Sequence, residues 1–171
     1  MYQYLKTEAS PKILVEAVKL IGTKETVGKD HNPTILGWAE ELGLQKTYTN
    51  DEIPWCGLFV AICAHRAGVE VVKSPLWALS WAKYGTLSET PMLGDILTFT
   101  RSGGGHVGIY VGEDEKCYHV LGGNQSNMVS VTRIQKVRLH QARRTAWKIA
   151  QPSNVRQIFL DSKGIISKNE K

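Results

Sequence analysis

Cys56 is the cysteine whose sequence surroundings best suit nucleophilic chemistry. It lies in the segment Ile53-Pro54-Trp55-Cys56-Gly57, in the predicted first turn of a helix. Backbone N–H groups in a first turn are unpaired and the helix dipole is positive there, so the nucleophilic thiolate is stabilised. Gly57 would leave room for a substrate to approach the thiol. The alternative is that Cys56 is a small buried apolar residue.

His106 is the candidate general base. It follows the glycine turn Gly103 to Gly105 and begins the predicted strand 106–111. The first residue of a strand after such a turn is held rigidly and stays open on one side, as a catalytic base must be. The alternative is an exposed histidine at a strand end. Among the other histidines, His119 in the middle of a strand is the strongest competitor.

Asn124 is the candidate residue for orienting the base. An imidazole that accepts protons needs its second ring nitrogen held by an acceptor. In a meander, the end of one strand lies beside the start of the previous one, so we expect Asn124 near His106. The alternative is that the asparagine in Gly122-Gly123-Asn124-Gln125 serves the turn alone.

The other two cysteines have no comparable setting. Cys63 lies two turns further along the Cys56 helix among apolar residues, and Cys117 begins a strand, so we interpret both as structural. Three cysteines cannot form a complete disulfide framework, which favours a reducing compartment. A metal site built from Cys56, Cys63, Cys117 and His119 is a rival interpretation, but it lacks the Cys-x-x-Cys spacing of structural zinc sites. We expect neither metal nor cofactor.

The elements that must position these residues divide into a helical half and a strand-rich half. Start signals with proline predict four helices, at Ser10-Pro11, Asn32-Pro33, Pro54 and Ser74-Pro75. Gly22, Gly43 and Gly68 end the first three. Alternating patterns and turn signals then predict five strands, over 96–100, 106–111, 116–121, 128–134 and 144–149. This order predicts an α+β fold in which N-terminal helices pack on an antiparallel β-meander.

The size and composition suit one globular domain. The chain has 171 residues, of which 42% are hydrophobic and 22% charged. We expect the domain to span residues 1–150. Residues 151–171 are polar and lysine-rich, and form either a disordered tail or a small appended element. We expect a monomer.

The formal net charge of +5 favours polyanionic partners. The densest cationic stretch, from Lys136 to Lys148, is explained at least as well by a solvated strand face. A basic nucleic-acid-binding module without enzymatic activity is the alternative function. It requires clustered cations interleaved with exposed aromatics, whereas here the aromatics lie in the helical half.

No stretch is apolar for long enough to span a bilayer, and the first residues lack the pattern of a signal peptide. We therefore expect no membrane insertion. The chain would be cytoplasmic as synthesised and would reach the periplasm or cell wall by release or by secretion without a signal peptide.

The ordered motifs resemble the CHAP and NlpC-type branch of papain-like cysteine peptidases. The resemblance is carried by Pro54 to Val60, by Gly94-Asp95-Ile96 and by Gly105 to Gly112. It is most similar to small bacterial and phage proteins that also carry His-Asn-Pro and Gly-Gly-Asn-Gln, here His31-Asn32-Pro33 and Gly122 to Gln125. The similarity covers about residues 10 to 150.

The resemblance implies a papain-like fold and cleavage of an amide bond in peptidoglycan. Its nucleophile corresponds to Cys56, its base to His106 and its orienting residue to Asn124. Many CHAP domains have a glutamate two residues before that asparagine, where this chain has Gly122. Asn124 would then orient the ring alone or with Gln125. Such an enzyme is an N-acetylmuramoyl-L-alanine amidase or a stem-peptide endopeptidase, and serves as a phage lysin or an antibacterial effector.

Substrate contacts are expected around the nucleophile. Trp55 and Trp77 could line a groove for peptide or sugar, whereas Trp81 suits core packing better. Gly57 and Gln125 complete the expected substrate-binding set. The partner is polymeric peptidoglycan, joined by an immunity or inhibitor protein if the chain is a toxin.

Overall fold

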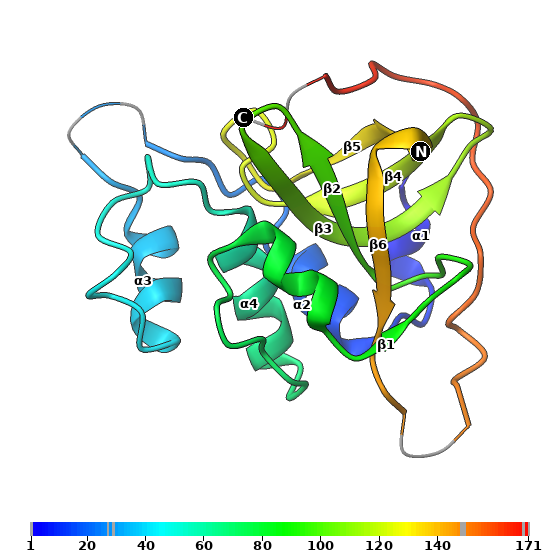
Figure 1. Cartoon of the computed structure of the whole chain (residues 1–171), viewed down its shortest axis with the longest axis horizontal. Coiled ribbons are helices and arrows are strands. Elements are labelled where there is room, and N and C mark those ends of the chain that lie inside the picture. Colours follow the sequence, from blue (N-terminus) through cyan, green and yellow to red (C-terminus); the bar gives the residue numbers. More distant parts are fainter. Residues whose placement is uncertain (1, 27, 29, 148–149, 169, 171) are drawn as a thin grey trace.

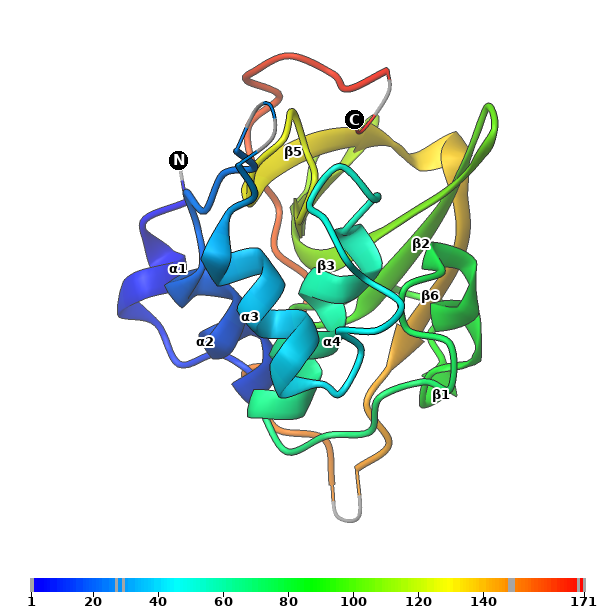
Figure 2. The ribbon, with the colours of Figure 1, turned by 90° about the vertical axis from the view of Figure 1, so that its left-hand side faces the viewer.

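The computed structural model describes residues 2–26, 28, 30–147, 150–168 and 170. Helices lie against one face of a six-stranded antiparallel sheet, as Figures 1 and 2 show from two sides. The architecture is α+β, as predicted, and is consistent with a papain-like fold. Among the described residues, no helix combines the length and the apolar character needed to cross a membrane.

Within the described ranges, four α-helices make up the helical layer: α1 (Tyr4–Thr7), α2 (Lys12–Lys19), α3 (Pro33–Glu41) and α4 (Cys56–Arg66). The start of α3 matches its sequence signal, because the Asn32 side chain accepts hydrogen bonds from the N–H groups of Thr34 and Ile35. Gly22, Gly43 and Gly68 all have positive φ angles, which suits the ends predicted there.

The sheet has the strand order β1-β6-β2-β3-β4-β5. Its strands are β1 (Thr86–Leu87), β2 (Ile96–Arg101), β3 (Gly104–Glu113), β4 (Cys117–Gly122), β5 (Ser130–Gln135) and β6 (Leu139–Arg144). The 3-10 helices η1 (Ala78–Lys83) and η2 (Lys136–Arg138) complete the elements. The strands β2 to β5 form the predicted meander, and β2 pairs with β3 so that Phe99 lies opposite His106.

Three local predictions were wrong. Ser10 does not cap α2, since the N-cap is Pro11. The helix predicted from Ser74 forms only the 3-10 helix η1. The last strand covers 139–144 and not 144–149, because it pairs with β2 through Leu139 to Arg143; residues 148–149 lie outside the described residues.

Two hydrophobic clusters enclose the sheet. The larger lies between helices and sheet and contains Leu14, Phe59, Val107 and Ile109 among others. The smaller lies around Phe99 and Tyr110 with further residues of β4 to β6. Because successive residues of a strand face opposite sides, β3 contributes side chains to both clusters and is rigidly held.

The cationic stretch from residue 136 to residue 144 is largely tied into the fold. Lys136 pairs with Glu113 at 2.5 Å, and Arg144 pairs with Asp95 at 2.7 Å. The Arg143 side chain donates to the backbone oxygens of Tyr84 and Gly85. Lys148 lies outside the described residues. These described cations therefore support the sheet and do not form a purely solvated face.

Candidate active site

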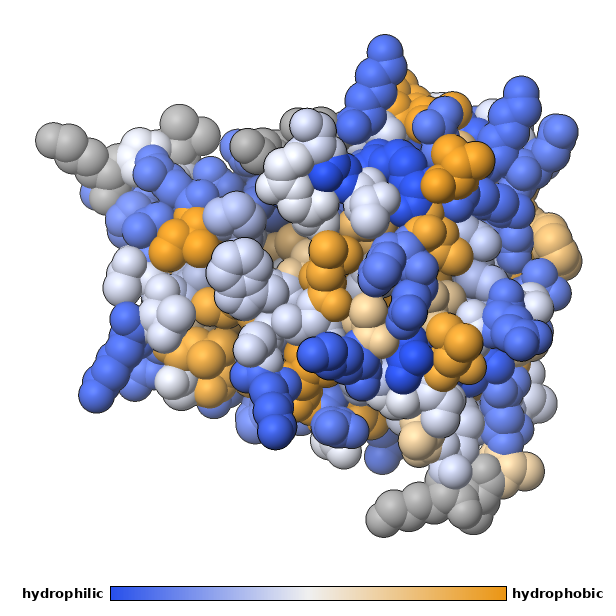
Figure 3. All heavy atoms as spheres, in the orientation of Figure 1, coloured by the Kyte–Doolittle hydropathy of each residue, from blue (hydrophilic) through white to orange (hydrophobic). Residues whose placement is uncertain are grey.

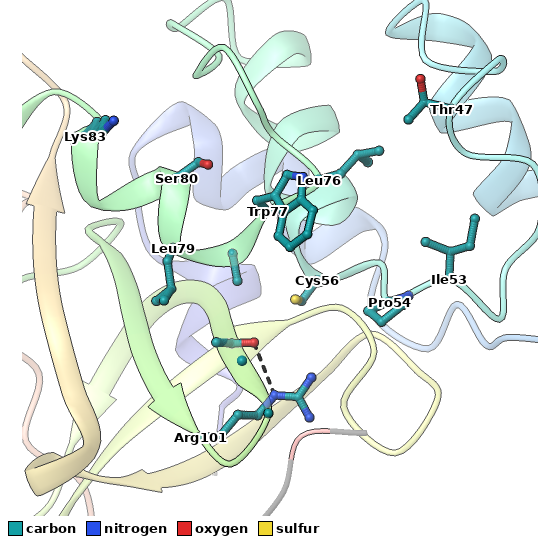
Figure 4. A pocket seen from close by; sticks show the side chains of 14 residues that line it. Thr47, Ile53, Pro54, Cys56, Leu76, Trp77, Leu79, Ser80, Lys83 and Arg101 are labelled. Carbon is teal, nitrogen blue, oxygen red and sulfur yellow. Dashed lines mark hydrogen bonds between the residues drawn. The ribbon is translucent and has the colours of Figure 1, made fainter.

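Cys56 is the first residue of α4, as predicted. Its side chain is 5% exposed and reaches the floor of a pocket (Figure 4). Burial raises the pKa of the thiol and outweighs the opposing effects of the Val107 N–H, the Arg101 charge and the N–H groups of the helix start. The expected stabilisation of a thiolate is therefore present but smaller than the cost of burying it.

His106 lies in β3 and is fully buried. Its ring stacks on Phe99, with centroids 6.5 Å apart. The Cys56 thiol interacts with the N–H of Val107, the next residue after His106, so the sulfur lies beside the start of β3. Within the described residues, Nδ1 of His106 has no hydrogen-bond partner. The structure thus brings the predicted nucleophile and base to the same place.

The second ring nitrogen of His106 is held by Gln125. Gln125 Oε1 lies 3.1 Å from His106 Nε2. The amide nitrogen of Gln125 donates to the backbone oxygens of Val120 and Ser130, which fixes the amide with its oxygen toward the ring. Because that oxygen can only accept, Nε2 must carry the proton, and the lone pair of neutral imidazole lies on Nδ1.

Gly122 makes room for this contact. A Cβ atom at position 122 would lie 2.8 Å from Gln125 Oε1 and 3.1 Å from His106 Nε2. A side chain on the strand at this point would therefore occupy the space that Gln125 fills from the following loop. The sequence predicts Gln125 as a substrate contact and as a residue that assists Asn124. The feature of the sequence that indicates its contact with the imidazole is Gly122, because a glycine there leaves space for the glutamine side chain.

Asn124 does not reach the imidazole in the described contacts. It is buried, with φ of 55°, and no hydrogen bond joins it to His106. Ser126 and Asn127 also have positive φ angles. These left-handed residues shape a tight loop that returns the Gln125 side chain to β4, β5 and His106. A direct role for Asn124 in turnover stays a prediction.

The loop that bears Gln125 is anchored to the helical layer. The N–H of Gly22 donates to the Val129 oxygen at 2.9 Å, and that of Glu25 donates to the Asn127 oxygen at 2.8 Å. The Glu25 side chain in turn accepts from Trp55 Nε1 at 3.1 Å. Hydrogen bonds thus join the segment of Gly22 and Glu25 both to the loop after Gln125 and to Trp55, which precedes Cys56.

Burial changes the basicity of His106. Burial lowers its pKa to about 4, although the Glu170 carboxylate and the Gln125 hydrogen bond act in the opposite direction. Arg101 and Arg138 lower the pKa further. Both the thiol and the imidazole are therefore neutral near pH 7.

A pocket of about 740 Å³ opens above Cys56. Figure 4 shows the Trp77 ring and the Arg101 side chain on opposite sides of the Cys56 sulfur, with Leu79 to one side. Trp77 is 76% exposed. Lys83 and Arg101 are the charged residues in the described lining, and Figure 3 shows hydrophobic surface between polar side chains near the middle of this face.

Gly57 serves the wall of the pocket. A Cβ at this position would lie 2.3 Å from the Pro75 oxygen and 2.7 Å from the Leu76 oxygen. The glycine therefore lets the segment before η1 cross the start of α4, which brings Trp77 over Cys56. This differs from the expected role, in which Gly57 leaves space for a substrate.

Trp55 lies away from the pocket, contrary to the expected groove contact. Its side chain is fully buried, packs against Trp38 with centroids 6.1 Å apart and touches the backbone at Gly123. The indole N–H is satisfied by Glu25. The prediction for Trp55 was wrong because the partner of its indole, Glu25, lies 30 residues away in the chain and no local pattern indicates it. Trp55 positions the start of α4 and the loop before Gln125.

The remaining cysteines are buried and free, and burial raises the pKa of both Cys63 and Cys117. His119 Nε2 donates to the Asp114 carboxylate at 2.8 Å, and His119 Nδ1 accepts from the Tyr2 hydroxyl at 2.7 Å. In the part of the chain that the structure describes, no group of three or more His, Cys, Asp or Glu side chains could hold a metal ion.

Comparison with known families agrees with this geometry. Residues 48–124 match the family model of the CHAP domain. The matched stretch contains Cys56 and His106 and ends immediately before Gln125. No curated protein matches the chain. The family implies a hydrolase that acts on peptidoglycan.

Proposed function

Because residues 48–124 belong to the CHAP domain family, we propose that this protein is a cysteine hydrolase that cleaves an amide bond of peptidoglycan. Cys56 is the nucleophile, His106 is the general base and Gln125 orients the imidazole. The observation that carries the proposal is the fixed orientation of the His106 imidazole by its hydrogen bond to Gln125. Gln125 fixes the proton on Nε2, and the unpartnered Nδ1 is left to accept the thiol proton beside the start of α4.

Proton transfer comes first. Nδ1 of His106 takes the proton of the Cys56 thiol, and the imidazolium is stabilised by the Gln125 oxygen at Nε2. The transfer depends on substrate entry, because burial opposes both charged forms in the closed site. Polar groups of a bound substrate and the unpaired N–H groups of the first helical turn offset this cost.

Acylation follows from the same geometry. The sulfur attacks the amide carbonyl carbon, a C–S bond forms, and the oxyanion is held by the backbone N–H of Cys56. Collapse of this intermediate breaks the C–N bond, and His106 gives its proton to the leaving amine. A water molecule, deprotonated by His106, then attacks the thioester. The acid is released and the thiol regains its proton.

The pocket supplies the substrate contacts. The exposed ring of Trp77 offers a flat surface for a sugar or an aliphatic side chain, and apolar residues around it exclude water. Gly57 contributes indirectly, by letting the Trp77 segment lie close to α4. The cleaved bond is either the link between N-acetylmuramic acid and L-alanine or a bond within the stem peptide.

The biological role that suits such an enzyme is that of a phage lysin or an antibacterial effector. It would be made in the cytoplasm and act on the wall or in the periplasm after release or export. An effector would also require an immunity protein in the producing cell. We propose that the chain works as a monomer, because one chain carries Cys56, His106 and Gln125.

Digestion of purified peptidoglycan tests the proposal. Soluble fragments are expected from wild-type protein and not from Cys56→Ala, and mass spectrometry of their new ends identifies the bond. New amino groups on L-alanine indicate an amidase, and new ends within the peptide indicate an endopeptidase. Intact peptidoglycan after incubation with folded wild-type protein contradicts the proposed function.

A further inference from the structure

The segment that follows β6 returns to the site along the sheet. Figures 1 and 2 show its described part passing around the outside of the sheet. The Leu160 N–H donates to the Glu113 oxygen at 2.8 Å, and the Ser167 N–H donates to the Arg133 oxygen at 2.9 Å. Arg133 also donates to the Gly164 oxygen at 2.6 Å. The path of this segment is therefore fixed by backbone contacts.

Glu170 is buried, although it lies in a polar, lysine-rich segment. It is 2% exposed, and its two carboxylate oxygens accept from Arg138 at 2.8 Å and 2.7 Å. Arg138 also donates to the backbone oxygens of Ser167 and Thr100. A two-pronged arginine–carboxylate contact is among the stronger polar interactions of proteins. By contrast, Asp161 in the same segment is exposed.

This ion pair lies beside the catalytic base. Thr100, which Arg138 contacts, follows Phe99, the residue that pairs with His106 across β2 and β3. Burial raises the pKa of the Glu170 carboxyl, but Arg138 and then the His106 charge outweigh burial and lower it. His106 itself is fully buried, and its Nδ1 has no partner among the described residues. The segment thus places a buried carboxylate close enough to the imidazole for the two charges to interact.

We propose that Arg138 forms a carboxylate-binding subsite of the catalytic centre, and that Glu170 occupies this subsite as an intramolecular competitor of acidic peptide substrates. Stem peptides carry free carboxylates, so a substrate can replace Glu170 by making the same contact. The inference rests on the proposed function for its substrate. It adds a binding determinant outside the CHAP match of residues 48–124.

Because the Glu170 carboxylate occupies the subsite, it weakens the apparent affinity for substrate by an amount that can be measured. A substrate that binds only after Glu170 leaves has an apparent dissociation constant raised by the inverse of the open fraction. Glu170→Lys places a positive charge against Arg138 and expels the segment. Asp161→Lys makes the same charge change at an exposed position and serves as the matched control.

The first measurement is the hydrolysis of muropeptides by the full-length chain. Glu170→Lys is expected to lower KM by about fivefold or more for a substrate with free carboxylates, with kcat within about twofold of wild type. Asp161→Lys is expected to behave as wild type. An unchanged KM in Glu170→Lys, or a fall in its kcat to a tenth or less, overturns the proposal, because Glu170 would then be inert or would assist the base.

The second measurement tests the subsite. Glu170→Lys is expected to prefer a free-carboxylate substrate over its amidated form by about fivefold or more in kcat/KM. Arg138→Gln also releases the segment, but it lacks the guanidinium and should lose that preference. Equal use of the two substrates by Glu170→Lys, or an undiminished preference in folded Arg138→Gln, contradicts a carboxylate subsite at Arg138.

A measurement without turnover separates this inference from the proposed function. Opening the site relieves the burial that suppresses both charged groups, so Cys56 in Glu170→Lys should react with iodoacetamide severalfold faster than in Asp161→Lys. A free-carboxylate muropeptide should slow this alkylation in Glu170→Lys, and its amidated form should not. If peptidoglycan stays intact while these differences are observed, the function is wrong and the subsite stands. Identical alkylation rates contradict closure by Glu170.

Discussion

Gln125 and His106 are joined by a hydrogen bond that passes through the space above Gly122. The glutamine comes from the loop after β4, but its oxygen reaches the position that a side chain on β4 itself would reach. The imidazole is therefore oriented from the loop, and the amide nitrogen of Gln125 is fully used in holding the loop to β4 and β5.

Gln125→Ala is expected to reduce kcat by about tenfold to a hundredfold, because the Nε2 proton loses its acceptor and the productive tautomer is no longer selected. Gln125→Glu keeps an acceptor oxygen but loses the donors to the Val120 and Ser130 oxygens, so its activity should lie between those of Gln125→Ala and wild type. Steady-state kinetics on soluble muropeptides measure both effects. Asn124→Ala is expected to lose less activity than Gln125→Ala. The opposite ranking would assign the orienting role to Asn124.

Gly122→Ala is expected to disturb the same contact. The added Cβ would lie 2.8 Å from Gln125 Oε1, so the amide must shift away from the ring. We expect a loss of kcat similar to that of Gln125→Ala. The double variant with Gln125→Ala should be no worse than Gln125→Ala alone, because residues that act as one unit are not additive. Full additivity in this cycle would show that the two changes act separately.

Cys56→Ala should lower activity by at least about a thousandfold, as loss of a nucleophile usually does. Cys63→Ala and Cys117→Ala are the matched controls, since both thiols are buried away from the pocket. The controls should retain activity wherever circular dichroism shows a folded protein. A peptidoglycan-degrading Cys56→Ala protein would remove the thiol from the mechanism.

Trp77→Ala is expected to raise KM severalfold and to leave the free energy of unfolding nearly unchanged. The indole is 76% exposed, so its removal costs little packing, but the pocket loses its flat wall. Trp55→Ala provides the contrast. Its ring is fully buried, and truncation should destabilise the fold by about 3–5 kcal/mol. Chemical denaturation and kinetics together separate the two outcomes.

The stability of the fold should depend on pH through His106. Its pKa is lowered from 6.5 to about 4 by burial, so between these values the unfolded chain binds more protons than the folded one. Stability is therefore unaffected by this group above about pH 6.5 and falls as the pH drops toward 4. His106→Gln should show a flatter profile in urea unfolding between pH 4 and 7. Parallel profiles would mean that His106 titrates normally.

The sequence was sufficient for features that depend on local signals. The proline and asparagine at Asn32-Pro33 predict the start of α3, and the glycine turn before His106 predicts β3. Features that depend on partners far away in the chain could not be predicted from local sequence signals. Trp55 is buried because Glu25 and Trp38 receive it, and the helix expected after Ser74 shortens to η1.

Some features of the candidate site also follow from local sequence signals, and others depend on the assembled fold. The position of Cys56 at a helix start follows from the sequence, but the direction of its pKa shift depends on burial, which only the assembled fold shows. Gln125 and Asn124 are adjacent, and the choice between them depends on loop backbone angles. Glu170 lies about 60 residues from His106 along the chain, and no motif connects the two.

The anchoring of the Gln125 loop to Gly22 and Glu25 has a consequence for biosynthesis. The helical layer with Cys56 leaves the ribosome first, but the loop that orients the base emerges only after about 100 further residues have been added to the Glu25 region. Because these contacts are distant in sequence, they form late in folding. A nascent chain would therefore carry a thiol without a working base until the loop around Gln125 has been synthesised and has docked on the helical layer.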